Sequence, residues 1–165
     1  MTMPVIRNIR ESDNQSMASI LRSTLVEFNI KLEGTAYYDA STDDLFSFFR
    51  HPASIYFIAE LDGKVVGGAG IYPTKHLPED TCELVKMYLL PEVRNLGLGS
   101  KLIVQCLSFA KNAGYKQVYL ETMPELKKAV TIYKKFGFEY LSGPMGLTDH
   151  YGCSIWMLKS FDQAD

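Results

Sequence analysis

The chain has 165 residues, of which 47% are hydrophobic and 12% are aromatic, enough to fill the core of one domain over residues 1–165. Its formal net charge is only −2, and it has no Lys/Arg-rich run. These values argue against a nucleic-acid footprint or a membrane-surface patch, and by default they favour a small-molecule or protein substrate.

The start of the chain and its cysteines indicate the compartment. No apolar stretch near the start is long enough for a signal peptide, and no window approaches the length of a membrane span, so we expect a cytoplasmic protein. Cys82, Cys106 and Cys153 are widely spaced and form no Cys-x-x-Cys motif. They predict reduced thiols, with neither a disulfide framework nor a metal site.

The first fifty residues predict one strand and two helices. Residues 5–10 alternate as a strand, and apolar residues then recur at helical spacing over 17–28. Ser12 or Asp13 is placed to cap that helix. Residues 41–44 predict the cap of a second, aromatic helix, which should end at the following His-Pro pair.

The rest of the chain predicts a hairpin followed by alternating strands and helices. Strands over 54–60 and 65–72 flank an Asp-Gly turn and should pair antiparallel, and the glycines of the second strand predict close packing or a bulge. Further strands are expected over 81–90, 117–121, 138–141 and 153–158, with helices over 100–113 and 125–136. This order predicts a mixed α/β sheet of about seven strands with helices on both faces.

The segment 89–101 predicts an anion site, because an apolar strand runs into a glycine turn that opens a helix. Gly97 and Gly99 allow the backbone N–H groups to face inward, and the positive end of the helix dipole is aimed at the same point. The spacing matches neither a dinucleotide fingerprint, which would need a small residue at Leu102, nor a Walker loop.

The remaining pattern, Arg-x-x-Gly-x-Gly over 94–99, resembles the acyl-CoA-binding loop of the GNAT superfamily of N-acetyltransferases. Residues 82–91 look like the fourth strand of that family. Residues 129–138 are similar to its Ala-x-x-x-Tyr-x-x-x-Gly-Phe helix and the exit into the sixth strand. The resemblance implies a mostly antiparallel sheet in which the fourth and fifth strands splay apart.

The resemblance also implies acetyl-CoA as the cosubstrate, with its pantetheine arm between the splayed strands. Met87, Tyr88 and Leu89 would supply backbone contacts, and an N–H near Leu89 would polarise the thioester carbonyl. Asparagine tolerates left-handed geometry, so the loop should keep its shape at Asn95. The pyrophosphate would be held by Arg94, Asn95, Leu96, Gly97, Leu98, Gly99 and Ser100.

Two residues match the family's proton-handling positions. Glu83 would act as the general base, directly or through water, and Tyr133 would protonate the departing CoA thiolate. The competing interpretations are a solvent-facing strand that presents Glu83 with Lys86, and a core role for Tyr133. His150, in the loop before the last strand, would contact the acceptor or serve as an alternative base, whereas a His150–Cys153 nucleophile pair is not favoured.

The sequence therefore predicts an N-acetyltransferase that acts on a primary amine of a small molecule or a protein by direct attack in a ternary complex, without an acyl-cysteine. The alternative of the same fold is a non-catalytic acyl-CoA sensor or interaction module. A nucleotide-binding domain unrelated to CoA is a third hypothesis, which the failed fingerprints oppose. Many members of the family are homodimers, although no apolar stripe in this sequence identifies an interface.

Overall fold

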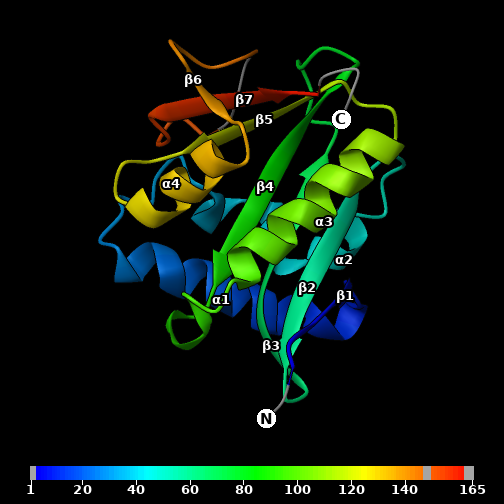
Figure 1. Cartoon of the computed structure of the whole chain (residues 1–165). Helices are drawn as coiled ribbons and strands as arrows, with labels where there is room; N and C mark the ends of the chain where they lie inside the picture. The colour runs from blue at the N-terminus through cyan, green and yellow to red at the C-terminus, as the bar shows by residue number, and fades with distance from the viewer. Residues whose placement is uncertain (1–2, 147–149, 162–165) are drawn as a thin grey trace.

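A seven-stranded sheet with the order β1-β2-β3-β4-β5-β7-β6 runs through the molecule (Figure 1). The computed structural model describes residues 3–146 and 150–161. The strands are β1 (Val5–Asn8), β2 (Ile55–Leu61), β3 (Lys64–Tyr72), β4 (Thr81–Leu89), β5 (Gln117–Thr122), β6 (Glu139–Leu141) and β7 (Ile155–Ser160). The predicted strands are confirmed, with shifts of one or two residues at most ends.

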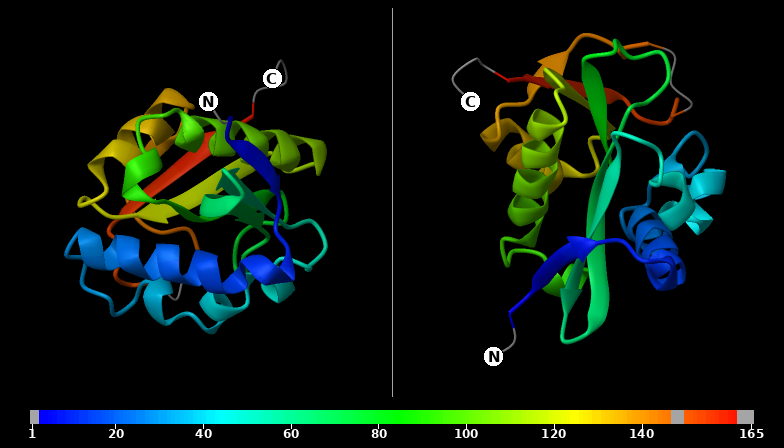
Figure 2. Two further views of the ribbon diagram at one scale, coloured as in Figure 1. Left: turned by 90° about the horizontal axis from the view of Figure 1, so that it is seen from below. Right: turned by 90° about the vertical axis from the view of Figure 1, so that its right-hand side faces the viewer.

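Helices cover both faces of this sheet, as the sequence predicts (Figure 2). One face carries α1 (Asn14–Glu27) and α2 (Leu45–Phe48), and the other carries α3 (Leu98–Asn112) and α4 (Lys127–Lys135). The short 3-10 helices are η1 (Glu11–Asp13), η2 (Ala36–Tyr38), η3 (Ala40–Asp43) and η4 (Pro91–Val93). Within the described ranges, no helix has the length and apolar character needed to cross a bilayer.

The strands β4 and β5 form the one parallel pair among the described neighbours, and they separate soon after they meet. Their register contains Thr81–Gln117, Cys82–Val118 and Glu83–Tyr119, with no later pair in the described part of the chain. The two strands are joined through α3, the kind of crossover that a parallel pair requires. The predicted splay of the fourth and fifth strands is confirmed.

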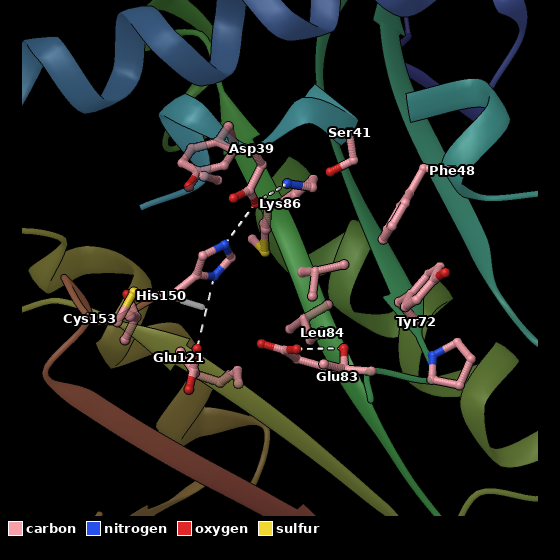
Figure 3. Close-up of a pocket in the computed structure, with 18 of the residues that line it drawn as sticks. Asp39, Ser41, Phe48, Tyr72, Glu83, Leu84, Lys86, Glu121, His150 and Cys153 are labelled. Atoms are coloured by element: carbon pink, nitrogen blue, oxygen red, sulfur yellow. Dashed lines mark hydrogen bonds and ion pairs between the residues drawn. The ribbon is translucent and has the colours of Figure 1, made fainter. Parts of the chain in front are cut away.

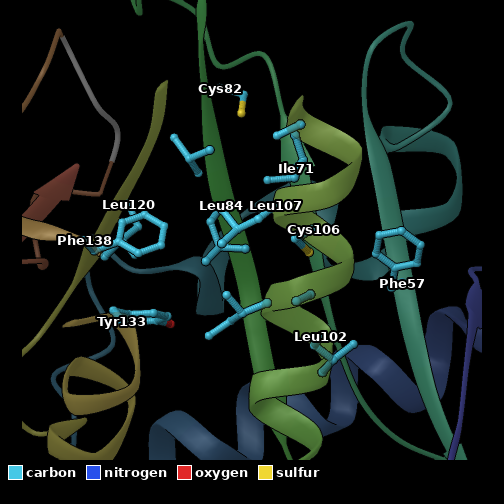
Figure 4. Packing of buried hydrophobic residues seen from close by; sticks show 14 of the residues in the cluster. Phe57, Ile71, Cys82, Leu84, Leu102, Cys106, Leu107, Leu120, Tyr133 and Phe138 are labelled. Atoms are coloured by element: carbon cyan, nitrogen blue, oxygen red, sulfur yellow. The ribbon is translucent and has the colours of Figure 1, made fainter. Parts of the chain in front are cut away.

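A continuous apolar core fills the space between the sheet and α3 (Figure 4). Leu102, Cys106 and Leu107 of α3 pack onto Ile71 of β3 and Leu84 of β4, and all five side chains are buried. Their positions in α3 follow the helical repeat that the sequence shows. A second cluster lies on the other face, where Met17 and Ile20 of α1 pack with Tyr56 and Ile58 of β2.

Two glycines of β3 let Tyr56 pack flat on the sheet. A Cβ atom on Gly68 or Gly70 would lie 2.5 or 2.6 Å from the Tyr56 ring, closer than atoms can approach. The register between β3 and β4 shifts at these glycines, and Lys86 opposite them has a φ of 52°. The close packing expected at these glycines is confirmed, whereas this bulge carries its extra residue on β4 and not on the strand 65–72. The Tyr56 hydroxyl donates a hydrogen bond to the Lys86 carbonyl at 2.6 Å.

One predicted cap is wrong. The expected cap of α1 at Ser12 or Asp13 is replaced, because the Asp13 carboxylate accepts hydrogen bonds from the Arg7 guanidinium and the Arg10 backbone N–H. The cap of α2 is confirmed, since the Asp44 side chain accepts from the Ser47 N–H. A buried ion pair with β1 is therefore the preferred use of Asp13.

Candidate active site

A cavity of about 720 Å³ opens between the splayed strands and the segments that contain η2, η3 and α2 (Figure 3). Its lining comes from these segments, from the end of β3 and the loop after it, from β4 and β5, from α4 and from residues shortly before β7. The polar and ionisable side chains that carry its chemistry are Asp39, Thr74, Glu83, Lys86, Glu121, Tyr133 and His150.

Three side chains on one wall form a chain of charged contacts. Lys86 Nζ donates to Asp39 Oδ2 at 3.0 Å, and the same oxygen accepts from His150 Nε2 at 2.7 Å. The Lys86 side chain is only 5% exposed, because the bulge turns it inward. Asp39 therefore joins a β4 cation to the loop before β7.

The contacts of Asp39 shift two pKa values in opposite directions. Burial alone would raise the pKa of Asp39, but the hydrogen bond with His150 and the charge of Lys86 outweigh it and hold the pKa at about 2. Burial would lower the pKa of His150, but the Asp39 carboxylate outweighs burial and raises it. The pair thus favours a charged carboxylate and an imidazole that holds its proton to higher pH.

Glu83 lies on the floor of the cavity and is 7% exposed. Its Oε1 accepts a hydrogen bond from Thr74 Oγ1 at 2.6 Å. Burial raises the pKa of Glu83 to about 7; the Thr74 hydrogen bond opposes this shift, and repulsion from the Glu121 carboxylate adds to it. A carboxyl group with this pKa can accept and release a proton near neutral pH.

Tyr133 enters the cavity from α4 and is buried. Its hydroxyl lies 3.9 Å from the sulfur of Met87, on the part of β4 that has separated from β5. Burial raises the pKa of the Tyr133 hydroxyl above its usual value, so the group keeps its proton at neutral pH. It can therefore act as a proton donor beside the splay.

The Leu89 backbone faces away from β3 at the edge of this opening. Leu90 N–H donates to the Val66 carbonyl, and hydrogen-bonded pairs alternate along an antiparallel ladder. The pair Gly67–Leu89 is therefore of the non-hydrogen-bonded kind, which turns the Leu89 N–H and C=O toward the β5 side.

The loop between β4 and α3 has the backbone geometry of an anion site. Asn95 and Gly97 have φ values of 67° and 80°, as the tolerance of asparagine for this geometry led us to expect. No side chain in the described part of the chain caps α3, so its first N–H groups are available to a ligand. The loop lies outside the lining of the 720 Å³ cavity.

Arg94, at the start of this loop, is engaged with α1. Its guanidinium forms a bidentate pair with Glu27 at 2.6 and 2.9 Å and donates to the Leu89 carbonyl at 2.9 and 3.1 Å. It also lies 5.1 Å from the centre of the Phe28 ring. The guanidinium thus ties the glycine loop to the end of α1.

Residues 16–138 match the model of the acetyltransferase (GNAT) family. The chain belongs to this family. It is 36% identical over 157 residues to the uncharacterized N-acetyltransferase YjgM of Escherichia coli K12, a match that covers 94% of each chain.

Solved structures agree with this GNAT fold. A GNAT acetyltransferase from Staphylococcus aureus Mu50 has a TM-score of 0.85 and 19% identity, with 96% of this chain and 99% of that chain covered. YncA from Salmonella typhimurium, solved with acetyl-CoA, has a TM-score of 0.77 and 16% identity, with coverages of 98% and 95%. The predicted family, fold and enzyme class are confirmed.

Five of the predicted site residues of this GNAT protein line the cavity, namely Glu83, Met87, Tyr88, Tyr133 and His150. The solvent-facing alternative for Glu83 and Lys86 is wrong, because both side chains are buried. The predicted phosphate-binding residues 94–100 and Leu89 lie outside this cavity.

Sequence reasoning missed Asp39, Lys86 and Glu121. For Lys86 and Glu121 a signal was present, since each is a charged residue within a strand that is otherwise largely apolar. Asp39 lies in an irregular segment, and no pattern distinguishes it there. Cys153 also lines the cavity, but burial raises the pKa of its thiol to about 12, so it is not a thiolate at neutral pH.

Proposed function

We propose that this protein transfers an acetyl group from acetyl-CoA to a primary amine by direct attack within a ternary complex. The observation that carries the proposal is the pairing, in one cavity, of a carboxyl group with a pKa of about 7 and a tyrosine that keeps its proton. Acyl transfer to an amine needs both a proton acceptor and a proton donor. The high pKa of the Cys153 thiol supports a route without an acyl-cysteine.

The residues present fit the acetyl-CoA cosubstrate. The backbone of β4 beyond Glu83 has no partner strand on the β5 side in the described register, so Met87, Tyr88 and Leu89 would bind the pantetheine arm. The N–H groups of residues 95–100 would hold the pyrophosphate at the start of α3. Arg94 would join them by exchanging Glu27 for a phosphate oxygen. A structural neighbour of this chain is described with acetyl-CoA as its cofactor.

When bound, acetyl-CoA supplies a thioester whose carbonyl carbon forms the new C–N bond while the C–S bond breaks and its electron pair leaves on sulfur. Glu83 takes the proton of the attacking ammonium and so frees the nitrogen lone pair. Tyr133 donates its hydroxyl proton to the sulfur, and the second proton that the nitrogen loses once the C–N bond has formed passes through solvent and restores the Tyr133 hydroxyl, so that the products are a neutral amide and the CoA thiol. The Leu89 N–H, which is turned toward the splay, would stabilise the negative charge that develops on the carbonyl oxygen.

The first experiment combines calorimetric titration of acetyl-CoA with thiol release across a panel of amines, for the wild type and Glu83→Gln. We expect Glu83→Gln to keep its affinity for acetyl-CoA and to lose about 10²–10⁴-fold in turnover. The wild-type rate should fall below a pH of about 7 as Glu83 is protonated, and this acidic limb should be absent in the variant. Glu79→Gln, at an exposed position, is the matched control.

The outcomes separate the hypotheses. Acetyl-CoA binding without thiol release on any amine would favour the sensor alternative. An unchanged pH profile in Glu83→Gln would mean that water or His150, and not Glu83, is the general base. Tighter binding of ATP or NAD than of acetyl-CoA would overturn the cosubstrate assignment.

A further inference from the structure

The proposed mechanism gives no role to the buried carboxylate of Glu121. The Tyr119 hydroxyl donates to Glu121 Oε2 at 2.7 Å and accepts from the Met145 N–H at 3.2 Å. Glu121 Oε1 has no hydrogen-bond partner among the described residues, although the side chain is only 2% exposed. Its contact with His150 Nδ1, at 3.9 Å, is too long for a hydrogen bond.

Glu121 Oε1 is therefore held in place and turned toward the cavity. Tyr119 fixes the carboxylate by its other oxygen, and Glu121 and His150 both line the cavity in Figure 3. A buried carboxylate oxygen without a donor is costly, and a ligand that brings an N–H⁺ donor removes that cost. The unsatisfied acceptor thus favours a cationic ligand at this end of the cavity.

The charges around this position favour the same ligand. Glu83 and Glu121 lie on neighbouring strands, close enough for their charges to repel each other. The Lys86 ammonium and the His150 Nε2 both contact Asp39 instead. Lys75 and His76 also line the cavity but are exposed, and the His51 ring lies 5.3 Å from that of Tyr72. The buried floor is thus acidic.

The opposite wall of the cavity is aromatic. The rings of Phe48 and Tyr72 are stacked, with their centres 4.1 Å apart, and both line the cavity across from His150 in Figure 3. A wall of this kind binds an apolar body, and a carboxylate next to the nitrogen would lie against the acidic floor. The two walls together suit a molecule with a cationic head and an apolar stem.

We propose that Glu121 Oε1 binds the ammonium nitrogen of the acceptor beside Glu83, and that the cavity selects primary amines with an apolar body and no carboxylate next to the nitrogen. The catalytic part of this inference rests on the proposed function, whereas the binding step does not. Once the ammonium is bound, its N–H bond breaks toward Glu83, which receives the proton and leaves the lone pair on nitrogen.

The test uses n-butylamine, L-norvaline and butan-1-ol, measured without acetyl-CoA by ligand-observed NMR titration at neutral pH. L-norvaline is n-butylamine with a carboxylate on the carbon next to nitrogen, and the alcohol replaces the cation by a neutral group. We expect the wild type to bind n-butylammonium at least about tenfold more tightly than either analogue, as a charge-assisted hydrogen bond predicts. Equal binding of n-butylammonium and L-norvaline would overturn the proposal without any variant.

The variant Glu121→Gln tests whether Glu121 accounts for the preference for n-butylammonium. We expect it to weaken n-butylammonium binding about tenfold or more, whereas Glu79→Gln, which removes an equal charge at an exposed position, should leave binding unchanged. Glu121→Asp keeps the charge and serves as a second variant if the glutamine form fails to fold. Wild-type affinity in Glu121→Gln would overturn the assignment.

Measurements of turnover distinguish a substrate-binding role of Glu121 from a merely structural one. In Glu121→Gln the KM for n-butylamine should rise about tenfold, while the KM for acetyl-CoA stays constant. The acidic limb should move to lower pH, because Glu83 loses the repulsion of Glu121 while still facing His150, Lys86 and Thr74. If the wild type binds n-butylammonium through Glu121 but releases no CoA with any amine, the proposed function fails and the binding inference stands.

Discussion

The glycine loop over 94–100 and the acidic cavity are built in different ways. The loop obtains its anion-binding geometry from a contiguous stretch of backbone, with left-handed residues at Asn95 and Gly97 and an uncapped helix start. The cavity obtains its chemistry from side chains that six separate segments bring together. The first region therefore depends on local conformation and the second on tertiary packing.

The two regions also differ in charge. Positive backbone dipoles dominate the loop, whereas the buried carboxyls of Glu83 and Glu121 dominate the floor of the cavity. This separation suits a reaction between an anionic donor and a cationic acceptor. Four substitutions test whether the regions can be disturbed independently, in order of decreasing effect.

Gly97→Val should disrupt the anion-binding geometry of the loop and leave the cavity intact. The φ of 80° is unfavourable for a β-branched residue, although nothing lies within 4 Å of a Cβ at this position. We expect acetyl-CoA to bind about a hundredfold more weakly by calorimetry, because the N–H groups lose their alignment. Gly63→Val, with a φ of 76° and equally open space in the β2–β3 turn, is the control that should keep its affinity. Normal affinity in Gly97→Val would refute the phosphate assignment.

Asp39→Asn should disturb the cavity alone. It leaves the buried Lys86 ammonium without its carboxylate partner, so we expect the free energy of unfolding to fall by about 2 kcal/mol near pH 7. The folded-state pKa of Asp39, about 2, lies below its unfolded value, so its contribution exists above pH ~4 and is lost as the pH falls toward 2.

Urea unfolding of the wild type and Asp39→Asn at several pH values measures this difference. The two proteins should converge in stability at low pH, and acetyl-CoA affinity should be the same in both at pH 7. A stability difference that did not shrink with acid would contradict the role of the Asp39 charge.

Tyr133→Phe removes the proposed proton donor, which lies beside the part of β4 that leads from the cavity to the glycine loop. Because a thiolate is a good leaving group, we expect the loss of this proton donor to lower kcat only about tenfold, with the KM for acetyl-CoA unchanged. Steady-state kinetics at saturating amine measure the effect, and the exposed Tyr140→Phe is the control. Unaltered kcat would remove Tyr133 from the mechanism.

Glu27→Gln should have the smallest effect, and it should strengthen acetyl-CoA binding where Gly97→Val weakens it. It releases Arg94 from a partly exposed ion pair of modest strength, so acetyl-CoA should bind about twofold to fivefold more tightly. Calorimetry in low salt measures the change. Weaker binding would mean that the Glu27–Arg94 pair shapes the loop and that Arg94 contacts no phosphate.

The amino-acid sequence alone predicts the order of strands and helices and the glycine loop, and it singles out Glu83 and Tyr133. Hydrophobic periodicity, turn residues and contiguous motifs are local properties, so they can be recognised along the chain. The cap at Asp13 was the exception, because an ion pair to Arg7 of β1, six positions earlier, took its carboxylate.

The surroundings of those residues depend on contacts between distant parts of the chain. Asp39 contacts Lys86 and His150 across 47 and 111 positions, and Arg94 contacts Glu27 across 67. These contacts depend on the bulge at Lys86, on the splay of β4 from β5 and on the position of His150 before β7. The environment of Glu121 Oε1 is equally non-local, because its burial and its lack of a hydrogen-bond donor among the described residues result from how distant segments pack.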